Sequence, residues 1–370
     1  MDLILFFVVI VVITHGIEVF YKKVWVKGLT TTITFDQEHV SEGEEGFITE
    51  VITNEKGIPL PAIILKFALD RSISYLLPEN TNKSDYQYRN DCIVTMPYEK
   101  VTRQFEVKYT KRGYFKISEV QLVATDPFYK NIFVEKKDNQ ASIYVYPICS
   151  GVKEVLPSFE RMMGEYLQQR FLYEDPFAFK GIRSYEPTDS MKKINWGISA
   201  KTGELMVNQY YDSSHCSITI LLNLETEGML YYEELLEECI RIARTYLELY
   251  LQKGIPVRFV TNALDIETKI PVSIEEGAGK GHFEECLRKL ARLEVKEEMD
   301  SFLPFLKDTK LPRNGLAILI SVSQAEQLQL AYEDYLGADG HGEWFIPVHL
   351  STERRVQSRR VPIVYGEVLE

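Results

Sequence analysis

Oxygen-bearing side chains lie at the ends of three apolar segments in the second half of the chain. The segments are residues 217–224, 257–261 and 316–321, and the polar residues at or just after their ends are Asn223, Glu225, Glu227, Thr261, Asn262 and Ser321. Parallel strands end at one edge of a sheet, and open α/β folds bind ligands there. Two carboxylates at that edge can perform acid/base chemistry. One hypothesis is therefore an enzyme whose site lies at these strand ends.

Other reactive residues lack the spacing that catalysis or metal binding requires. The glycine-rich residues 276–281 do not match the phosphate-binding pattern Gly-x-x-x-x-Gly-Lys-Ser/Thr. Ser214 and His215 are adjacent, so on one strand they would point to opposite faces. The remaining histidines are dispersed and form no His-Glu-x-x-His pattern. We therefore expect no metal and no cofactor, and we favour a non-catalytic protein.

Net charge and cysteine content indicate which cellular compartment and which classes of partner are compatible with the chain. The 370 residues include 42 Lys and Arg against 54 Asp and Glu, a net charge of −12, which argues against nucleic acid as a partner. The five cysteines are an odd number with no Cys-x-x-Cys pair, so neither a disulfide framework nor a thiolate metal site is indicated. A reducing compartment agrees with this pattern.

The amino terminus is strongly apolar. Residues 3–13 are apolar without interruption, and the apolar character continues to residue 20. About 18 residues can just cross a hydrocarbon core of roughly 30 Å. We expect residues 1–27 to be an uncleaved anchor in the lipid bilayer. A cleaved signal peptide and a soluble core helix are the alternatives, and the first of these would need a basic start and a small-residue cleavage site.

The flanks of this segment predict its orientation. Lys22, Lys23 and Lys27 follow the apolar run, whereas only Asp2 precedes it. The positive-inside rule then predicts a single-pass protein of the cell membrane with the bulk of the chain facing the cytoplasm.

Two folded domains are predicted after the anchor, which makes the chain an α+β multidomain protein. Residues 28–150 contain short runs rich in β-branched and aromatic residues between turn signals, which predicts an immunoglobulin-like sandwich of roughly seven strands. The strands are expected at residues 30–35, 46–53, 63–70, 101–109, 114–125 and 141–146. The polar residues 79–90 are expected to form a mobile hairpin loop.

Residues 151–370 predict a doubly wound α/β domain. A helical linker is expected around residues 154–169, and the three apolar segments named above are the buried strands. Helices with apolar residues every three or four positions are expected at residues 236–250 and 283–293, and an edge strand at residues 344–350.

Four separated stretches resemble one bacterial family. They are residues 111–114 (KRGY), 126–128 (DPF), 144–147 (YVYP) and 181–207 (GIRSYEPTDSMKKINWGISAKTGELMV). The last is similar to the signature of the domain of unknown function 58, a von Willebrand A-like group typically found with MoxR-type AAA+ ATPases. The resemblance implies a membrane-tethered β-domain followed by a von Willebrand A-like domain, with a MoxR-type AAA+ ATPase as partner.

The chain departs from the cation turn of many von Willebrand A domains. That turn reads Asp-x-Ser-x-Ser, whereas the corresponding positions are Asn223, Glu225 and Glu227, and Ser321 stands where family members often carry Asp. Glu side chains would overfill a compact cage of oxygen ligands. We expect a loop that keeps the geometry without the ion.

Within residues 181–207, one set of residues has two interpretations. It is a partner-binding patch, because exposed aromatic and basic groups anchor partner surfaces. Alternatively it is a hairpin leading into the sheet, with the tryptophan buried and the aspartate bonded to a turn or an arginine. The residues are Arg183, Tyr185, Asp189, Lys192, Trp196 and Lys201.

These observations favour a membrane-anchored interaction or scaffold protein that works with a MoxR-type ATPase in the assembly or maturation of an envelope-associated complex. The alternatives are an extracellular, cation-dependent adhesive or wall-binding von Willebrand A protein and the strand-end enzyme described above.

Overall fold

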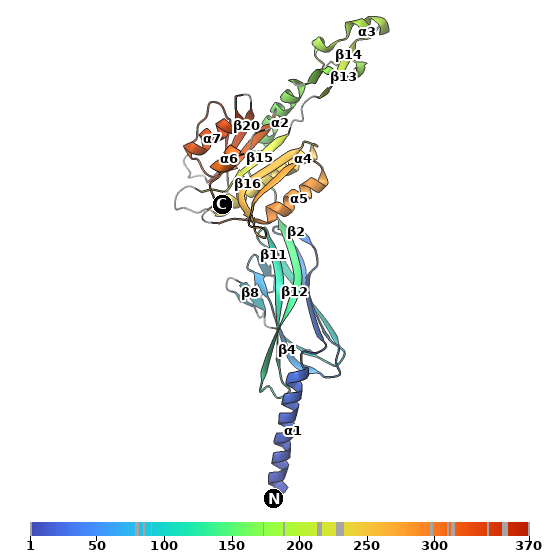
Figure 1. The fold of residues 1–370 in the computed structure, drawn as a ribbon, viewed down its shortest axis with the longest axis vertical. Coiled ribbons are helices and arrows are strands. Elements are labelled where there is room, and N and C mark those ends of the chain that lie inside the picture. The colour runs from blue at the N-terminus through green and yellow to red at the C-terminus, as the bar shows by residue number, and fades with distance from the viewer. Residues whose placement is uncertain are drawn as a thin grey trace. The chain divides into compact units, whose positions relative to one another are not determined.

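The chain folds into two compact units, Met1–Ile148 and Cys149–Glu370, and their division lies close to the expected boundary at residue 150 (Figure 1). The computed structural model describes residues 2–77, 81–83, 86–89, 91–172, 174–187, 189–212, 217–226, 233–296, 299–308, 311, 315–338, 340–349 and 354–368. The first unit is a helix followed by a β-sandwich. The second is an α/β sheet with an added hairpin.

Helix α1 (Asp2–Val24) begins the first unit, and most of its apolar side chains are exposed. Its stretch Ile4–Val24 is long and apolar enough to cross a membrane, and a signal sequence would have the same properties. Lys22 and Lys23 lie in its last turn. The predicted apolar helix is confirmed, and its function as an anchor stays a prediction.

Two sheets share one apolar core in the β-region of this unit. Alternate residues of β3 are buried, as expected for a strand with one face on a core. The first sheet has the order β1 (Leu29–Phe35), β3 (Glu45–Asn54), β10 (Lys100–Tyr109), β6 (Ile73–Tyr75). The second has the order β2 (His39–Ser41), β12 (Ile132–Tyr146), β11 (Gly113–Thr125), β4 (Leu60–Lys66), β9 (Asp91–Thr95). Five of the six predicted strands are present. The one expected at residues 63–70 is divided between β4 and β5 (Ala68–Asp70), which belong to different sheets.

A third, small sheet contains the polar segment expected as a loop. It consists of β5 (Ala68–Asp70), β8 (Tyr86–Arg89) and β7 (Thr81–Lys83), so part of residues 79–90 forms an antiparallel hairpin. Residues 79, 80, 84, 85 and 90 lie outside the described residues.

The second unit is built on a seven-stranded sheet with a parallel centre. Its order is β17 (Pro271–Gly277), β16 (Val257–Asp265), β15 (Ile218–Asn223), β19 (Leu316–Ser321), β20 (His341–Val348), β21 (Ile363–Glu367), and the short β18 (Leu293–Glu294) pairs with β16. Strands β17 and β18 run antiparallel to β16.

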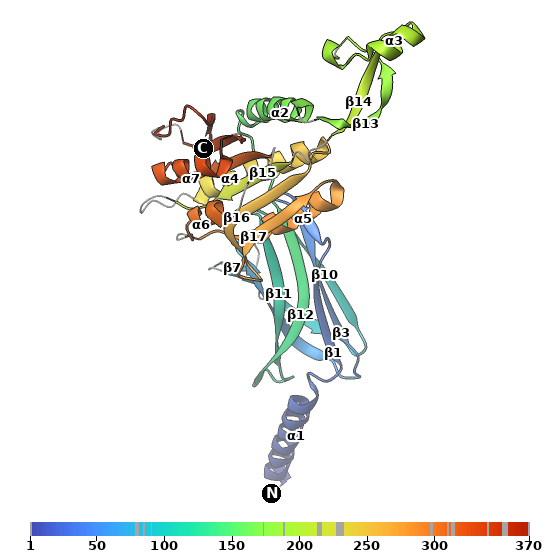
Figure 2. The same ribbon diagram turned by 45° about the horizontal axis from the view of Figure 1, so that its top comes forward.

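Helices pack on both faces of this sheet (Figure 2). One core joins the sheet to α2 (Val155–Leu172), α4 (Glu233–Gln252) and α5 (Lys280–Ala291). The other core joins it to α6 (Leu303–Asp308) and α7 (Glu326–Leu336). Successive residues of β15 belong to different cores, with Ile220 in one and Leu221 in the other. The predicted doubly wound arrangement is therefore present.

One strand position was predicted wrongly. The strand expected at the sheet edge is β20, which lies inside the sheet because β21 pairs with it in parallel. The sequence IVYGE of β21 is only partly buried and contains Gly366, so it lacks the continuous apolar run by which the buried strands are recognised.

The family-like segment belongs to a separate hairpin. Strands β13 (Glu174–Ser184) and β14 (Met206–Asp212) pair only with each other among the described strands. Between them lie the short 3-10 helix η1 (Met191–Lys193) and helix α3 (Trp196–Thr202). The predicted hairpin is confirmed, but its strands do not continue the seven-stranded sheet.

Candidate functional site

The loop after β13 is held by a bidentate ion pair. Arg183 donates from two guanidinium nitrogens to the two carboxylate oxygens of Asp189, each at 2.6 Å. The backbone N–H of Glu186 donates to the same carboxylate at 2.9 Å. The hydrogen bonds from Arg183 and then from Glu186 lower the pKa of Asp189 below its ordinary value. Asp189 is thus bonded both to an arginine and to a turn, as the structural interpretation expected.

Asn195 organises the tip that follows. Its Oδ1 accepts from the backbone N–H of Ile198 at 3.1 Å and caps α3, and its Nδ2 donates to Asn208 on β14 at 2.8 Å. Gly203 ends α3 in the left-handed region, at φ 78°. Local hydrogen bonds therefore define the shape of η1 and α3 on the hairpin.

Trp196 lies on the surface of this tip, so the expectation of a buried tryptophan was wrong. Its exposed fraction is 63%, and that of nearby Met191 is 70%. Ile194 and Val207, which pair across the hairpin, occupy the buried positions instead. Among the side chains that the structure describes in this hairpin, none covers most of the indole.

The lysines and the tyrosine of the proposed patch differ in their exposure. Lys192 and Lys201 are exposed, whereas Tyr185 is half-buried and its backbone N–H donates to Leu205 at 2.8 Å. Residues 191–202 carry three lysines and no Asp or Glu. We define the tip surface as Met191, Lys192, Trp196 and Lys201.

The structure also brings the predicted strand-end residues together. Asn223, Asn262 and Ser321 are fully buried, and Asn223 Nδ2 donates to Ser321 Oγ at 3.0 Å. Asn262 Nδ2 donates to Asn223 Oδ1 at 3.2 Å and to the backbone oxygen of Asp300 at 2.8 Å. The Asn262 Oδ1 atom accepts from the N–H of Leu224 at 3.0 Å. The convergence expected from the fold is therefore observed.

Two further polar side chains near the strand ends accept hydrogen bonds from backbone N–H groups. Glu225 accepts from the N–H of Phe302 at 3.0 Å, and Thr261 Oγ1 accepts from the N–H of Ala263 at 3.1 Å. Glu227 lies outside the described residues. Within the described part of the chain, no group of three or more His, Cys, Asp or Glu side chains could hold a metal ion. The buried amides act as a structural network that joins three strands.

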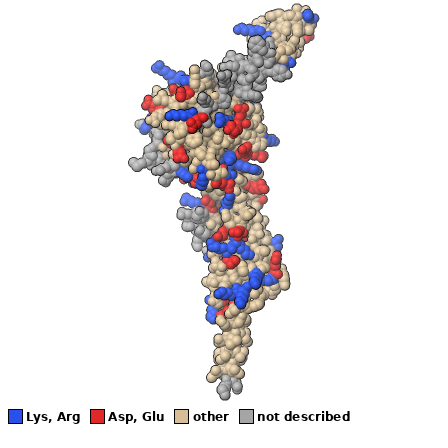
Figure 3. Space-filling model, viewed as in Figure 1, with Lys and Arg blue, Asp and Glu red and all other residues tan. Residues whose placement is uncertain are grey.

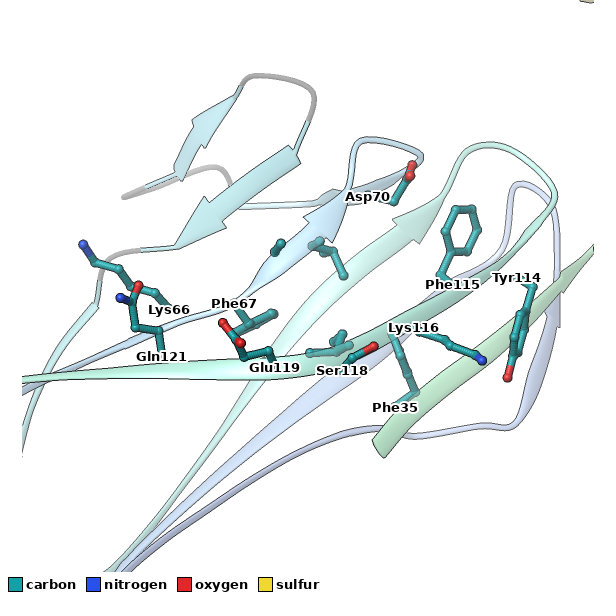
Figure 4. A pocket seen from close by; sticks show the side chains of 13 residues that line it. Phe35, Lys66, Phe67, Asp70, Tyr114, Phe115, Lys116, Ser118, Glu119 and Gln121 are labelled. Atoms are coloured by element: carbon teal, nitrogen blue, oxygen red, sulfur yellow. The ribbon is translucent and has the colours of Figure 1, made fainter. Parts of the chain in front are cut away.

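A cavity of about 450 Å³ lies in the first unit, between β1, β5 and β11 (Figure 4). Two of its polar side chains have partners within the unit. The Lys116 ammonium lies 4.9 Å from the centre of the Tyr114 ring, and Glu119 pairs with Lys136 at 2.7 Å. These contacts account for the charged groups at that wall of the cavity without a ligand.

One buried ionic cluster was not predicted from the sequence. Glu343 on β20 is fully buried, and its carboxylate accepts hydrogen bonds from Ser158 and Arg161, both on α2. The Tyr246 hydroxyl on α4 contacts the same Ser158. Ser158 and Arg161 lie three residues apart on a helix, but nothing in the local pattern links them to a strand almost two hundred residues later. The cluster joins α2 to the sheet.

This cluster leads to a pH prediction. Burial raises the pKa of Glu343, although the hydrogen bonds from Ser158 and Arg161 act in the opposite direction. A carboxyl whose pKa is higher in the folded state contributes stability that is lost as pH rises above the ordinary Glu pKa of about 4.3. We expect the stability of the wild type relative to Glu343→Gln to fall between about pH 4.3 and the raised pKa. Urea unfolding of the two proteins at a series of pH values checks this, and a stability difference that does not change with pH would contradict it.

Comparisons with known proteins give no family. No family model and no curated protein matches the chain. A CARDB domain from Pyrococcus furiosus, solved in complex with di-metal ions, is 17% identical, with 32% of this chain and 87% of that chain covered and a TM-score of 0.22. The α-2-macroglobulin of E. coli is also 17% identical, with 32% of this chain and 7% of that chain covered and a TM-score of 0.22.

Proposed function

We propose that this protein is a membrane-anchored, non-catalytic interaction protein whose tip surface binds a MoxR-type AAA+ ATPase during assembly or maturation of an envelope-associated complex. In this proposal α1 crosses the cell membrane and the rest of the chain faces the cytoplasm. The proposal includes the finer fold assignments, namely an immunoglobulin-like sandwich and a von Willebrand A-like domain of the domain of unknown function 58 type.

The observation that carries the proposal is the exposed indole of Trp196. Tryptophan is enriched among residues that dominate binding energy at interfaces, and such residues are surrounded by contacts that exclude water. Trp196 and Met191 lie on a tip whose backbone is already organised by the Asn195 cap and the Arg183–Asp189 pair. A preformed tip loses little conformational entropy on binding.

The charge of the tip surface indicates the chemistry of the partner. Residues 191–202 carry three positive charges in a chain whose net charge is −12. Opposite charges across an interface guide encounter and exclude wrong partners. The surface therefore fits an apolar groove bordered by acidic side chains, and we assign that groove to the ATPase.

Replacing Trp196 tests the proposal. The full-length protein in lipid nanodiscs is the immobilised component, and the MoxR-type ATPase of the same cell, held with a non-hydrolysable ATP analogue, is the soluble one. Trp196→Ala is expected to weaken binding about 30-fold, because truncating a central aromatic anchor costs about 2 kcal/mol. Lys192→Glu is expected to slow association, most strongly at low salt.

The matched control is Leu330→Ala, which removes a similarly exposed apolar side chain from α7 of the same unit. Its affinity for the ATPase should equal that of the wild type. The proposal is wrong if the wild type does not bind the ATPase, or if Trp196→Ala binds it with unchanged affinity.

A further inference from the structure

Hydrogen bonds to one buried carboxylate organise the connection between β11 and β12. The buried carboxylate of Asp126 accepts from the backbone N–H groups of Phe128, Lys130 and Asn131 at 2.9 to 3.0 Å. The side-chain amide of Asn131 donates to it at 2.6 Å. Residues 126–128 are one of the family-like stretches, so this motif has a structural role that the proposed function does not use.

This loop displays apolar side chains to the outside. Tyr129 is 66% exposed and Ile132, at the start of β12, is 71% exposed, and Phe128 is also exposed. Neighbouring Phe133 points the other way and packs against Tyr21 and Trp25, with ring centres 6.1 and 5.9 Å apart. We define the membrane-side loop as Phe128, Tyr129, Lys130 and Ile132.

Contacts with α1 determine the level of the loop along that helix. Lys130 Nζ lies 2.9 Å from Glu18 Oε1, within the apolar stretch Ile4–Val24. Glu18 is six residues before Val24, or about 9 Å along the axis at 1.5 Å per residue. Figures 1 and 2 both show the β11–β12 connection beside the carboxy-terminal part of α1.

Charge and aromatic content match the edge of a bilayer. Charged groups avoid the hydrocarbon core, and Trp and Tyr gather at the headgroup level. Glu18, Lys22 and Lys23 therefore place the last two turns of α1 among the headgroups, together with the loop that is bonded to Glu18. In Figure 3 the visible face of α1 is mostly tan, and Lys and Arg side chains gather on the adjoining part of the unit.

We propose that the membrane-side loop is a second membrane contact, which inserts Phe128, Tyr129 and Ile132 into the headgroup region beside α1. This inference rests on the proposed function in one respect, because it requires α1 to be a membrane anchor. The two contacts together hold the β-sandwich at a defined height on the bilayer, since a single helix alone would leave the unit free to tilt.

A tryptophan probe tests the inference. Full-length Tyr129→Trp is reconstituted into phosphatidylcholine–phosphatidylglycerol vesicles with or without brominated acyl chains, and the wild-type emission is subtracted to remove the three native tryptophans. The added indole should shift to shorter wavelength and lose about half of its emission to the brominated lipid, as expected for an interfacial residue. Ile132→Trp is a second probe with the same expectation, and circular dichroism establishes that both variants fold.

The matched control is Gln37→Trp at the other end of the same sandwich. Gln37 is exposed and lies two residues before His39, which pairs with Tyr144. Tyr144 is twelve residues from Ile132 along β12, about 40 Å at 3.3 Å per residue. The emission of this control should not change with brominated lipid.

The outcomes separate the two proposals. Wild-type protein that fails to float with vesicles would overturn the membrane anchor, and with it the proposed function. Protein that floats while neither the Tyr129→Trp probe nor the Ile132→Trp probe is quenched more than the Gln37→Trp control would overturn only the second membrane contact.

Discussion

Asn262→Ala is expected to lower the free energy of unfolding of the second unit by about 4 kcal/mol, because three groups each lose a hydrogen bond to this buried side chain, at about 1–3 kcal/mol each. These groups are the N–H of Leu224, the backbone oxygen of Asp300 and Oδ1 of Asn223. Asn262 itself is fully buried, so water cannot easily replace these bonds.

Denaturant unfolding of the full chain, followed by the emission of the buried Trp344, measures the loss. The control is Thr261→Val on the same strand, which removes a single hydrogen bond, to the N–H of Ala263, and should cost only about 1 kcal/mol. Equal losses for the two variants would show that the amide network does not hold the strand ends together.

Removal of the Asp126 carboxylate has the second large effect. Asp126→Ala leaves the N–H groups of Phe128, Lys130 and Asn131 without their acceptor. Hydrogen bonds to a charged group contribute about 1.5–3 kcal/mol each, but the loop amides regain bonds to water, so we expect a net loss of local stability of about 2–3 kcal/mol. Hydrogen exchange at these three amides should accelerate roughly 30- to 150-fold, since each 1.4 kcal/mol is a factor of ten.

The shifted pKa of Asp126 determines how the stability of the loop depends on pH. Burial alone would raise the pKa of Asp126, but the hydrogen bonds from Lys130, Asn131 and Phe128 outweigh it and the pKa lies below its ordinary value. The stabilisation is therefore complete above the ordinary Asp pKa of about 3.9 and is lost as pH falls below it through the lowered pKa. Asp138→Asn, at an exposed position on β12, is the control and should leave exchange in the loop unchanged.

Asp126→Ala is also expected to affect the insertion of the membrane-side loop into the bilayer. If Asp126→Ala accelerates exchange as expected, the membrane-side loop should insert less well, because its apolar side chains are no longer presented by a fixed backbone. A Tyr129→Trp probe in the Asp126→Ala background should then be quenched less by brominated lipid than the same probe in the wild-type background. Unchanged quenching would mean that insertion does not depend on the Asp126 turn.

Local periodicity accounts for most of the elements that were predicted correctly. Alternation along β3 and the continuous apolar run of β15 are properties of a few neighbouring residues, and they specify strands whatever the rest of the chain does. The convergence of Asn223, Asn262 and Ser321 was predictable as well, because parallel topology alone brings strand ends to one edge.

The errors have a common cause. Whether Trp196 is buried depends on which other side chains of the folded chain pack against it. Whether β20 is an edge strand depends on β21, which follows after a connection of 14 residues. Both are decided by contacts between distant segments, to which a local pattern is insensitive.

The amino-acid sequence was sufficient to predict the apolar helix, the order of the β and α/β units and the group of polar residues at the strand ends, because these follow from the spacing of residue types along the chain. Three sets of contacts become visible only in the folded chain. The strand-end amides bond to one another, Glu343 accepts hydrogen bonds from Ser158 and Arg161, and Lys130 pairs with Glu18. Side chains distant in sequence acquire partners only when packing brings them within hydrogen-bond distance, and burial then determines which of them must be paired.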